Sequence, residues 1–229
     1  MKTAKEFLKR IDLIKELPEE ELNLIINISI YKEYEKGNHV FFQNEPLKYI
    51  HFISKGSIKI YKTDTHGKEQ IVSILETGDM FPHTGFFSKG FYPAHAEALS
   101  DTILIMIPID EFERLLIENP TLSVKLFKLM GEKIIDLQNR LEEQILHNTY
   151  EKIILLLIRL AHKYGDEYTK DKVRLHSRFT HQELANMIGT SRETLNRTIT
   201  QLKKNDQIDI DNEGYLILHV TKLQQSLIL

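Results

Sequence analysis

Three charged residues within one short segment have the chemistry needed to recognise DNA bases. Arg192, Glu193 and Arg197 lie within six residues of one another, with Asn196 between them. Arginine can donate two parallel hydrogen bonds to guanine O6 and N7, and glutamate can accept one from cytosine N4. Such residues must lie near the N-terminal end of a helix that enters the major groove. The alternative is an ordinary surface helix, in which Glu193 and Arg197 simply form an i,i+4 ion pair.

The residues around this trio predict two short helices joined by a tight turn. Thr180 followed by Glu183 is a capping box, so the first helix begins there. Gly189 suits the left-handed residue that ends a helix, and Ser191 is a good N-cap for the next one. Two helices connected in this way form a helix-turn-helix. The apolar residues expected on their inner faces are Leu184, Ala185, Ile188, Leu195, Ile199 and Leu202.

The segment after the second helix predicts a β-hairpin. Residues 206–218 contain two alternating runs on either side of Asp211-Asn212-Glu213-Gly214. A turn of this composition between two short strands is typical of a hairpin. A hairpin placed directly after a helix-turn-helix is the wing of a winged helix.

The first half of the chain contains many short β-rich runs separated by turn residues. Strands this short and regularly spaced favour an antiparallel roll or sandwich over βαβ units. Two short helices are expected within residues 1–30, the second beginning at Leu17-Pro18, and another from Pro108 to about Glu118. The expected strands are His39–Phe42, Tyr49–Ile53, Ser57–Tyr61, Glu69–Leu75 and Ile103–Ile107, with turns that include Ser88-Lys89-Gly90.

A long helix is predicted from Pro120 to about His147. Its apolar residues are spaced by three or four and form one stripe along roughly seven turns. Such a stripe can cover the helix's own domain, but a helix near 40 Å long exceeds what one small domain can cover, which favours a dimer seam. Another apolar helix, Thr149–Lys163, and a polar linker, Gly165–Lys172, follow. The stripe consists of Leu126, Met130, Ile134, Leu137, Leu141 and Ile145.

The composition limits the classes of function. The chain has 229 residues, no cysteine and a net charge of −3, so disulfides, thiolate metal sites and cysteine nucleophiles are excluded. Residues 1–149 hold 18 Lys and Arg against 23 Asp and Glu, whereas residues 150–229 hold 12 against 10. No apolar run is long enough to cross a bilayer, and the first residues lack a secretory h-region. These features predict a cytoplasmic protein without a membrane partner.

Over nearly its full length the chain resembles the Crp/Fnr superfamily of bacterial transcription regulators. The resemblance rests on Thr180-x-Gln182-Glu183, on Gly189-x-Ser191-Arg192-Glu193-Thr194 and on Arg197, with Gly56, Gly67 and Gly78-Asp79 in the sensor. It implies an α+β fold with an N-terminal antiparallel β-roll sensor resembling a cyclic-nucleotide-binding domain (residues 1–118). A long dimerisation helix (119–147) and a C-terminal winged helix-turn-helix (148–229) follow.

The resemblance also implies how the protein binds DNA. In the family, Arg, Glu and Arg at positions 192, 193 and 197 accompany TGTGA-type half-sites, as in the cyclic-AMP receptor branch. Asn196 departs from the pattern, because the oxygen-sensing branch has serine there and the cyclic-AMP branch glycine. Partners would be double-stranded DNA, a second copy of the chain and, for an activator, RNA polymerase. The residues implied to hold DNA phosphates are Thr180, Gln182, Ser191 and Thr194, which set register without reading sequence.

The region that binds cyclic nucleotides in the family has lost its key residues here. By resemblance, His83 occupies the position of the phosphate-cassette glutamate, Pro93 that of the arginine and Ala94 that of the hydroxyl residue. Counted from Asn119-Pro120, the pair that contacts adenine becomes Leu137 and Gln138. We therefore expect that cyclic AMP is not the effector. What remains is a pocket rich in aromatic residues and histidine, expected to include Phe81, His83, Thr84, Phe86, Tyr92, His95, Leu137 and Gln138.

The role of that pocket stays open between several alternatives. Its rings can simply pack the roll. It can also bind a small effector, such as an anion held by His83, His95 and Lys89, or haem, since the CO-sensing branch places a histidine ligand at the position of His83 but also uses a cysteine that is absent here. No cofactor is assigned, and the regulator can also act without an effector. A further resemblance is to the arginine-catabolism regulators of low-GC Gram-positive bacteria.

Two other classes of function are alternatives to a regulator. A cupin-like metalloenzyme needs a His-x-His pair with a later Glu and His, and only His95-x-Glu97 approaches that pattern. A scaffold with a vestigial DNA-binding domain is disfavoured by the intact capping residues and turn glycine. The sequence thus predicts a regulator with no catalytic residues and no metal site.

Overall fold

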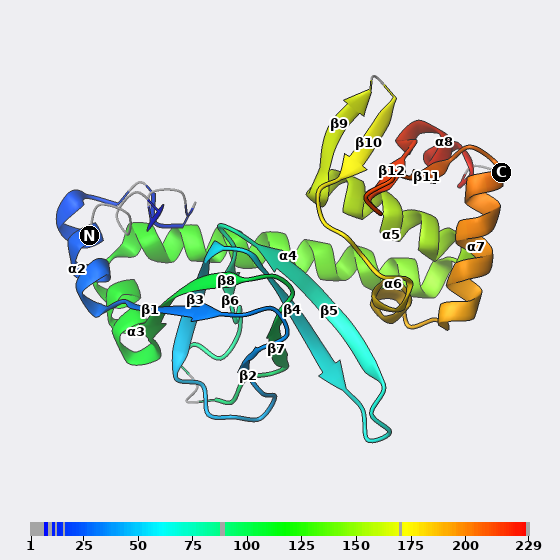
Figure 1. Ribbon diagram of the computed structural model, residues 1–229. Coiled ribbons are helices and arrows are strands. Elements are labelled where there is room, and N and C mark those ends of the chain that lie inside the picture. The colour runs from blue at the N-terminus through cyan, green and yellow to red at the C-terminus, as the bar shows by residue number, and fades with distance from the viewer. Residues whose placement is uncertain are drawn as a thin grey trace. The chain divides into compact units, whose positions relative to one another are not determined.

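The computed structural model describes residues 7–8, 11, 13–15, 17–87, 90–169 and 171–227. The chain divides into two compact units, residues 1–135 and 136–229 (Figure 1). The predicted turn residues Ser88 and Lys89, and most of the first sixteen residues, lie outside the described ranges. Among the described residues, no helix combines the length and apolar character needed to cross a bilayer.

The first unit contains two four-stranded sheets in which every strand pairing is antiparallel, as predicted. One sheet has the order β1-β8-β3-β6 and the other β2-β7-β4-β5. The five predicted strands are present as β2 to β5 and β8, although β2 ends one residue early. The bounds are β1 Ile30–Tyr34, β2 His39–Phe41, β3 Tyr49–Lys55, β4 Ser57–Thr63, β5 Glu69–Glu76, β6 Met80–Phe81, β7 His95–Ala98 and β8 Thr102–Pro108.

Three strands of this unit were not predicted. β1 carries two charged residues and is largely exposed, β6 has only two residues, and β7 reads His95-Ala96-Glu97-Ala98. Alanine and glutamate are depleted in strands. β7 forms because its neighbours supply hydrogen-bonding partners on both sides, β2 on one and β4 on the other.

Two apolar clusters hold the first unit together. One includes Phe52, Ile105 and Ile107 of the first sheet and packs against helices α2 (Glu19–Ile28) and α3 (Ile109–Glu118). The other fills the space between the two sheets and includes Phe41, Phe81 and Tyr92. Both helices were predicted. Each begins after a proline, Pro18 or Pro108, whose fixed φ suits entry into a helix.

The long helix α4, Pro120–Leu146, spans 27 residues and runs from the first unit into the second. Its predicted extent is confirmed to within one residue. Helix α5, Thr149–Tyr164, follows as a separate helix with its own N-cap residue, Asn148. Asn148 accepts a hydrogen bond from the Glu151 backbone N–H at 3.1 Å, and the Glu151 carboxylate accepts one from the Asn148 N–H at 2.9 Å. This reciprocal capping starts a separate helix at Thr149.

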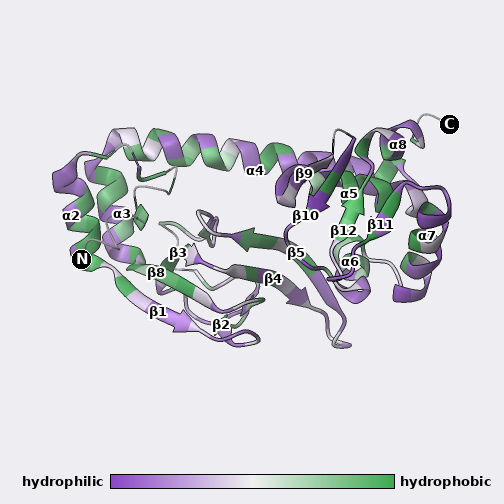
Figure 2. Ribbon diagram, turned by 45° about the horizontal axis from the view of Figure 1, so that its top comes forward, coloured by the Kyte–Doolittle hydropathy of each residue, from purple (hydrophilic) through white to green (hydrophobic). Residues whose placement is uncertain are grey.

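The second unit packs around α5, which Figure 2 shows as mainly hydrophobic and which buries seven of its residues. A four-stranded antiparallel sheet has the order β11-β12-β10-β9. The predicted polar linker 165–172 is wrong, because these residues begin a β-hairpin whose second strand pairs with the wing. The remaining bounds are β9 Gly165–Thr169, β10 Lys172–Leu175, α6 His181–Ile188, α7 Arg192–Lys204, β11 Ile208–Ile210, β12 Leu216–Leu218 and α8 Val220–Gln225.

Candidate nucleic-acid interface

Helix α6 begins and ends at the residues that the sequence indicated. The Thr180 hydroxyl accepts from the Glu183 backbone N–H at 3.2 Å, and the Glu183 carboxylate accepts from the Thr180 N–H at 2.7 Å. Gly189 closes the helix at φ 74°, in the left-handed region. The Thr190 N–H returns to the Ala185 carbonyl at 3.0 Å. The turn therefore delivers the chain to the next helix after only two further residues.

Helix α7 presents one buried face and one exposed face. Ser191 caps it by accepting from the Thr194 N–H at 3.1 Å. Leu195, Ile199 and Leu202 are at most 2% exposed. Because these side chains fix the rotation of the helix about its axis, the residues on the other side must face solvent.

Arg192, Glu193 and Arg197 all lie on that exposed face. The Arg197 guanidinium pairs with the Glu193 carboxylate, and their side chains are 77% and 75% exposed. An ion pair so open to water is weak, so both partners are free to exchange it for base edges. The geometry therefore allows both the surface pair and DNA reading, and it places all three side chains in the first two turns of α7.

Asn196 lies between the two helices rather than with the exposed trio. It is half-buried, and its side-chain oxygen shares a hydrogen bond with the imidazole Nδ1 of His181 on α6. This contact ties the helix-turn-helix together. Bidentate reading of adenine, which uses both the oxygen and the nitrogen of the amide, would require that bond to break.

The residues implied to hold phosphates lie at the N-termini of α6 and α7. Thr180 and Ser191 are N-caps, and both are exposed. The Ser191 and Thr194 hydroxyls share a hydrogen bond at 2.8 Å, and Gln182 donates to Asn186 at 2.8 Å. Helix N-termini present backbone N–H groups and a positive dipole end, which suits phosphate oxygens.

The wing hairpin is confirmed, with contacts that the sequence did not reveal. β11 and β12 pair from Ile208–Leu218 to Ile210–Leu216. Arg174 of β10 reaches across to Asp211 and Glu213, and two guanidinium groups, Arg174 and Arg178, lie over the Tyr215 ring. Sequence reasoning missed these contacts because Arg174 lies 37 residues before Asp211.

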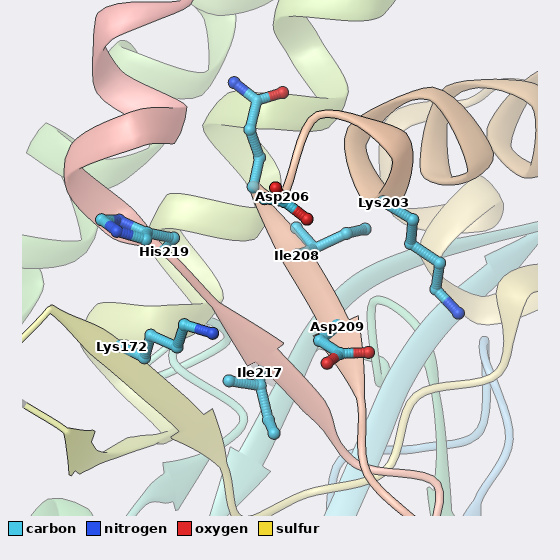
Figure 3. Close-up of a pocket in the computed structure, with 8 residues that line it drawn as sticks. Lys172, Lys203, Asp206, Ile208, Asp209, Ile217 and His219 are labelled. Carbon is cyan, nitrogen blue, oxygen red and sulfur yellow. The ribbon is translucent and has the colours of Figure 1, made fainter.

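A small polar cavity lies at the base of the wing, beside the C-terminal end of α7 (Figure 3). None of the predicted DNA-reading or phosphate-binding residues lines it. Its charges are mixed, because lysine and aspartate side chains both border it. The lining residues are Lys172, Lys203, Asp206, Gln207, Ile208, Asp209, Ile217 and His219.

In the sensor, two of the predicted pocket residues belong to the core between the sheets. Phe81 and Tyr92 are 1% and 4% exposed. The Tyr92 ring stacks on Phe41 at 3.6 Å between centroids, and its hydroxyl accepts from the Tyr49 backbone N–H at 3.2 Å. These rings pack the roll, which was one of the predicted alternatives.

The other predicted pocket residues are dispersed. Phe86 packs in the separate cluster beside Phe112, whereas His83 is half-buried and Thr84 is exposed. His95 lies on the outer face of its sheet, where its Nδ1 accepts from the Gln43 N–H at 3.2 Å and its ring stacks on Tyr61. Partial burial, with His39 nearby, lowers the pKa of His95.

The positions that would bind a cyclic nucleotide offer little to a phosphate. Pro93 is exposed, and Ala94 is buried. Neither side chain can donate a hydrogen bond. Leu137 and Gln138 are exposed on α4 within the second unit. Lys89 of the alternative anion site lies outside the described residues. Within the described ranges, no group of three or more His, Asp or Glu side chains is arranged to hold a metal ion.

The predicted dimer stripe on α4 needs a correction at its N-terminal end. Leu126 is 8% exposed and belongs to the sensor's own core, with Met130 packed against it. The other four, Ile134, Leu137, Leu141 and Ile145, are 55–71% exposed. Val124 and Phe127 are also exposed, at 53% and 76%. A spacing of three and four residues alternately relates Val124, Phe127, Gly131, Ile134, Gln138, Leu141 and Ile145.

Models of known protein families match segments in both units of the chain. The cyclic nucleotide-binding domain model matches residues 31–119, and the Crp-like helix-turn-helix domain model matches residues 151–226. The chain is 29% identical over 197 residues to the anaerobic regulatory protein of Bacillus subtilis, covering 86% of this chain and 82% of that protein. It is 24% identical over 200 residues to the global nitrogen regulator of Synechocystis, covering 86% and 88%.

Solved structures show the same fold. FixK2 from Bradyrhizobium japonicum aligns with a TM-score of 0.74 at 18% identity, covering 86% of this chain and 96% of that one. A CooA mutant from Carboxydothermus hydrogenoformans aligns with a TM-score of 0.75 at 21% identity, covering 89% of each. With an antiparallel roll, a long helix and a helix-turn-helix in this order, the chain belongs to the Crp/Fnr superfamily of DNA-binding transcription regulators.

Proposed function

We propose that this regulator reads a TGTGA-type half-site through Arg192, Glu193 and Arg197. The observation that carries the proposal is the rotation of α7, whose buried face leaves these three side chains in solvent near the N-terminus. Each arginine can donate two hydrogen bonds to a guanine, and Glu193 can accept from a cytosine. Thr180, Gln182, Ser191 and Thr194 hold phosphates on either side and set the register.

The protein acts as a homodimer on a pseudo-palindromic operator. Exposed apolar residues of α4 lie in a row from Val124 to Ile145 with alternating spacings of three and four, which is the pattern of a helix that pairs with a copy of itself. Gly131 also lies in this row and allows two helices to approach closely. Two-fold symmetry then places two copies of α7 about one DNA turn apart.

The sensor responds to a signal other than cyclic AMP. The side chains of Pro93 and Ala94 supply no donor for a cyclic phosphate, and the rings of Phe81 and Tyr92 are packed into the core. A small effector shifts the two long helices against each other and so changes the separation of the recognition helices. Mass spectrometry and visible absorbance of the purified protein test for a bound effector, including the haem alternative at His83.

The base-reading role is tested by binding measurements on a half-site selected from random duplexes. Arg197→Ala should cost about 1–3 kcal/mol on the selected site and relax the guanine preference there. Lys203→Ala is the matched control, because it removes one positive charge from the exposed C-terminal end of the same helix. If Arg197→Ala weakens binding to selected and scrambled DNA equally, Arg197 contacts phosphate and does not read a base.

A further inference from the structure

The wing of this protein carries the wrong charge for a DNA contact. Between Ile208 and Leu218 it contains Asp209, Asp211 and Glu213, and no lysine or arginine. An acidic hairpin brought close to a duplex would be repelled by the phosphates. Either the wing stays away from DNA, or another part of the unit compensates for its charge.

Arg174 of the neighbouring strand supplies part of that compensation. Its Nε donates to Asp211 Oδ2 at 2.6 Å, and its Nη2 donates to Glu213 Oε2 at 2.8 Å. The other Asp211 oxygen accepts from the backbone N–H groups of Glu213 and Tyr215, both at 2.9 Å. The carboxylate of Asp211 therefore shapes the turn with one oxygen and binds the guanidinium with the other.

The electrostatic state of Asp211 agrees with this geometry. Desolvation raises the pKa of its carboxyl, but the hydrogen bonds from Tyr215 and Arg174 outweigh that effect, so its pKa is lowered. Asp211 stays ionised, and it shares the positive charge of Arg174 with Glu213.

A second arginine completes the arrangement. The guanidinium carbons of Arg174 and Arg178 lie 4.1 Å and 4.7 Å from the centroid of the Tyr215 ring. Arg178 is exposed, and no carboxylate among the described residues pairs with it. It also lies two residues before Thr180, the N-cap of α6. Its charge is therefore available beside a helix N-terminus already suited to phosphate.

We propose that Arg174 is a positioning residue that offsets part of the negative charge of the wing, and that Arg178, held over the Tyr215 ring of the wing, contacts a DNA phosphate. This inference rests on the proposed DNA-binding function. The ligand is the phosphodiester backbone beside the half-site, so the contact adds affinity without sequence preference. Stacking on Tyr215 limits the freedom of the Arg178 side chain before DNA arrives.

The phosphate contact is tested by the salt dependence of binding by the full chain to the selected operator and to a scrambled duplex. Arg178→Gln should weaken binding to both duplexes about equally. The slope of log K against log salt should fall by about 0.9 per lost contact, or roughly 1.8 for a dimer. Arg159→Gln is the matched control, because it makes the same change of charge by breaking a half-buried pair with Glu143 at 2.7 Å. Equal slopes for the Arg178 and Arg159 variants would overturn the assignment.

The positioning role is tested by rescue. Arg174→Gln should weaken binding to both duplexes by about tenfold, because the wing then loses the one cation that Asp211 and Glu213 share, and phosphates repel the added net negative charge. Adding Asp211→Asn and Glu213→Gln should recover most of that loss. If the triple variant binds no better than Arg174→Gln, Arg174 does not act by neutralising the wing. Failure of the unmodified protein to bind any duplex would refute the proposed function itself. If the unmodified protein binds its operator and the Arg174 and Arg178 variants bind it with the same affinity, only this inference is refuted.

Discussion

Acid should unfold the sensor through one buried histidine, His51 of β3. Its ring is 2% exposed and stacks on Phe81 at 4.9 Å between centroids. Its Nδ1 is buried without a hydrogen-bonding partner. Burial lowers the pKa of His51 from 6.5 to about 3, partly offset by a hydrogen bond with the Phe81 backbone and reinforced by the charge of Lys32.

The sign and size of the effect follow from proton linkage. Between pH 6.5 and about 3 the unfolded chain binds a proton at His51 that the folded sensor excludes, so stability falls as the pH falls through that range. At pH 4.5 the unfolded imidazole is about 99% protonated and the folded one about 3%. That difference amounts to about 2 to 3 kcal/mol relative to pH 7.5. This is a large part of the stability of an ordinary domain.

Urea unfolding at pH 7.5 and pH 4.5 measures this loss, with His51→Phe as the comparison. Phenylalanine keeps a ring against Phe81 but cannot titrate, so the variant should lose about 2 to 3 kcal/mol less than the unmodified protein on acidification. Since the other histidines and the carboxylates titrate in both proteins, only the difference between the two losses is diagnostic. His51→Leu provides a second non-titrating variant if the phenylalanine does not fit. Equal losses in all three proteins would refute the reasoning.

Three further predictions concern the dimer, the turn and the core. Leu141, 62% exposed, lies in the apolar row of α4, and Leu141→Glu should yield monomers in analytical ultracentrifugation because it places a charge there. The neighbouring control Glu142→Gln should leave the dimer intact. An intact Leu141→Glu dimer would contradict the assigned dimer face. Gly189→Ala should cost about 1 kcal/mol of stability in urea unfolding, because φ is 74° and no atom lies within 4 Å of the added methyl group; an unchanged midpoint would show that the turn relaxes. Phe52→Ala should cost about 3–5 kcal/mol, since the side chain is fully buried; calorimetry showing a loss below 1 kcal/mol would contradict the core assignment.

The DNA-binding elements were predictable because their signals are local. The Thr180–Glu183 capping box, the left-handed Gly189 and the Ser191 N-cap involve hydrogen bonds between residues at most a few positions apart. The extent of α4 was predictable for the same reason, since it depends on the spacing of residues within one helix. A sequence determines such features directly, because both partners lie in the same window of the chain.

Only the tertiary structure decided which residues those elements bury or leave free. The same apolar spacing that defines α4 places Leu126 in the sensor core and leaves Leu141 in solvent. The sequence offers Asn196 as a candidate DNA contact, and only the structure shows that its amide oxygen binds His181 of another helix. β7 is a strand because its neighbours pair with it, and two wing carboxylates share an ion pair with Arg174, which lies 37 residues before Asp211 in the sequence. Each of these outcomes depends on contacts between segments far apart in the chain, and spacing within one segment carries no information about them.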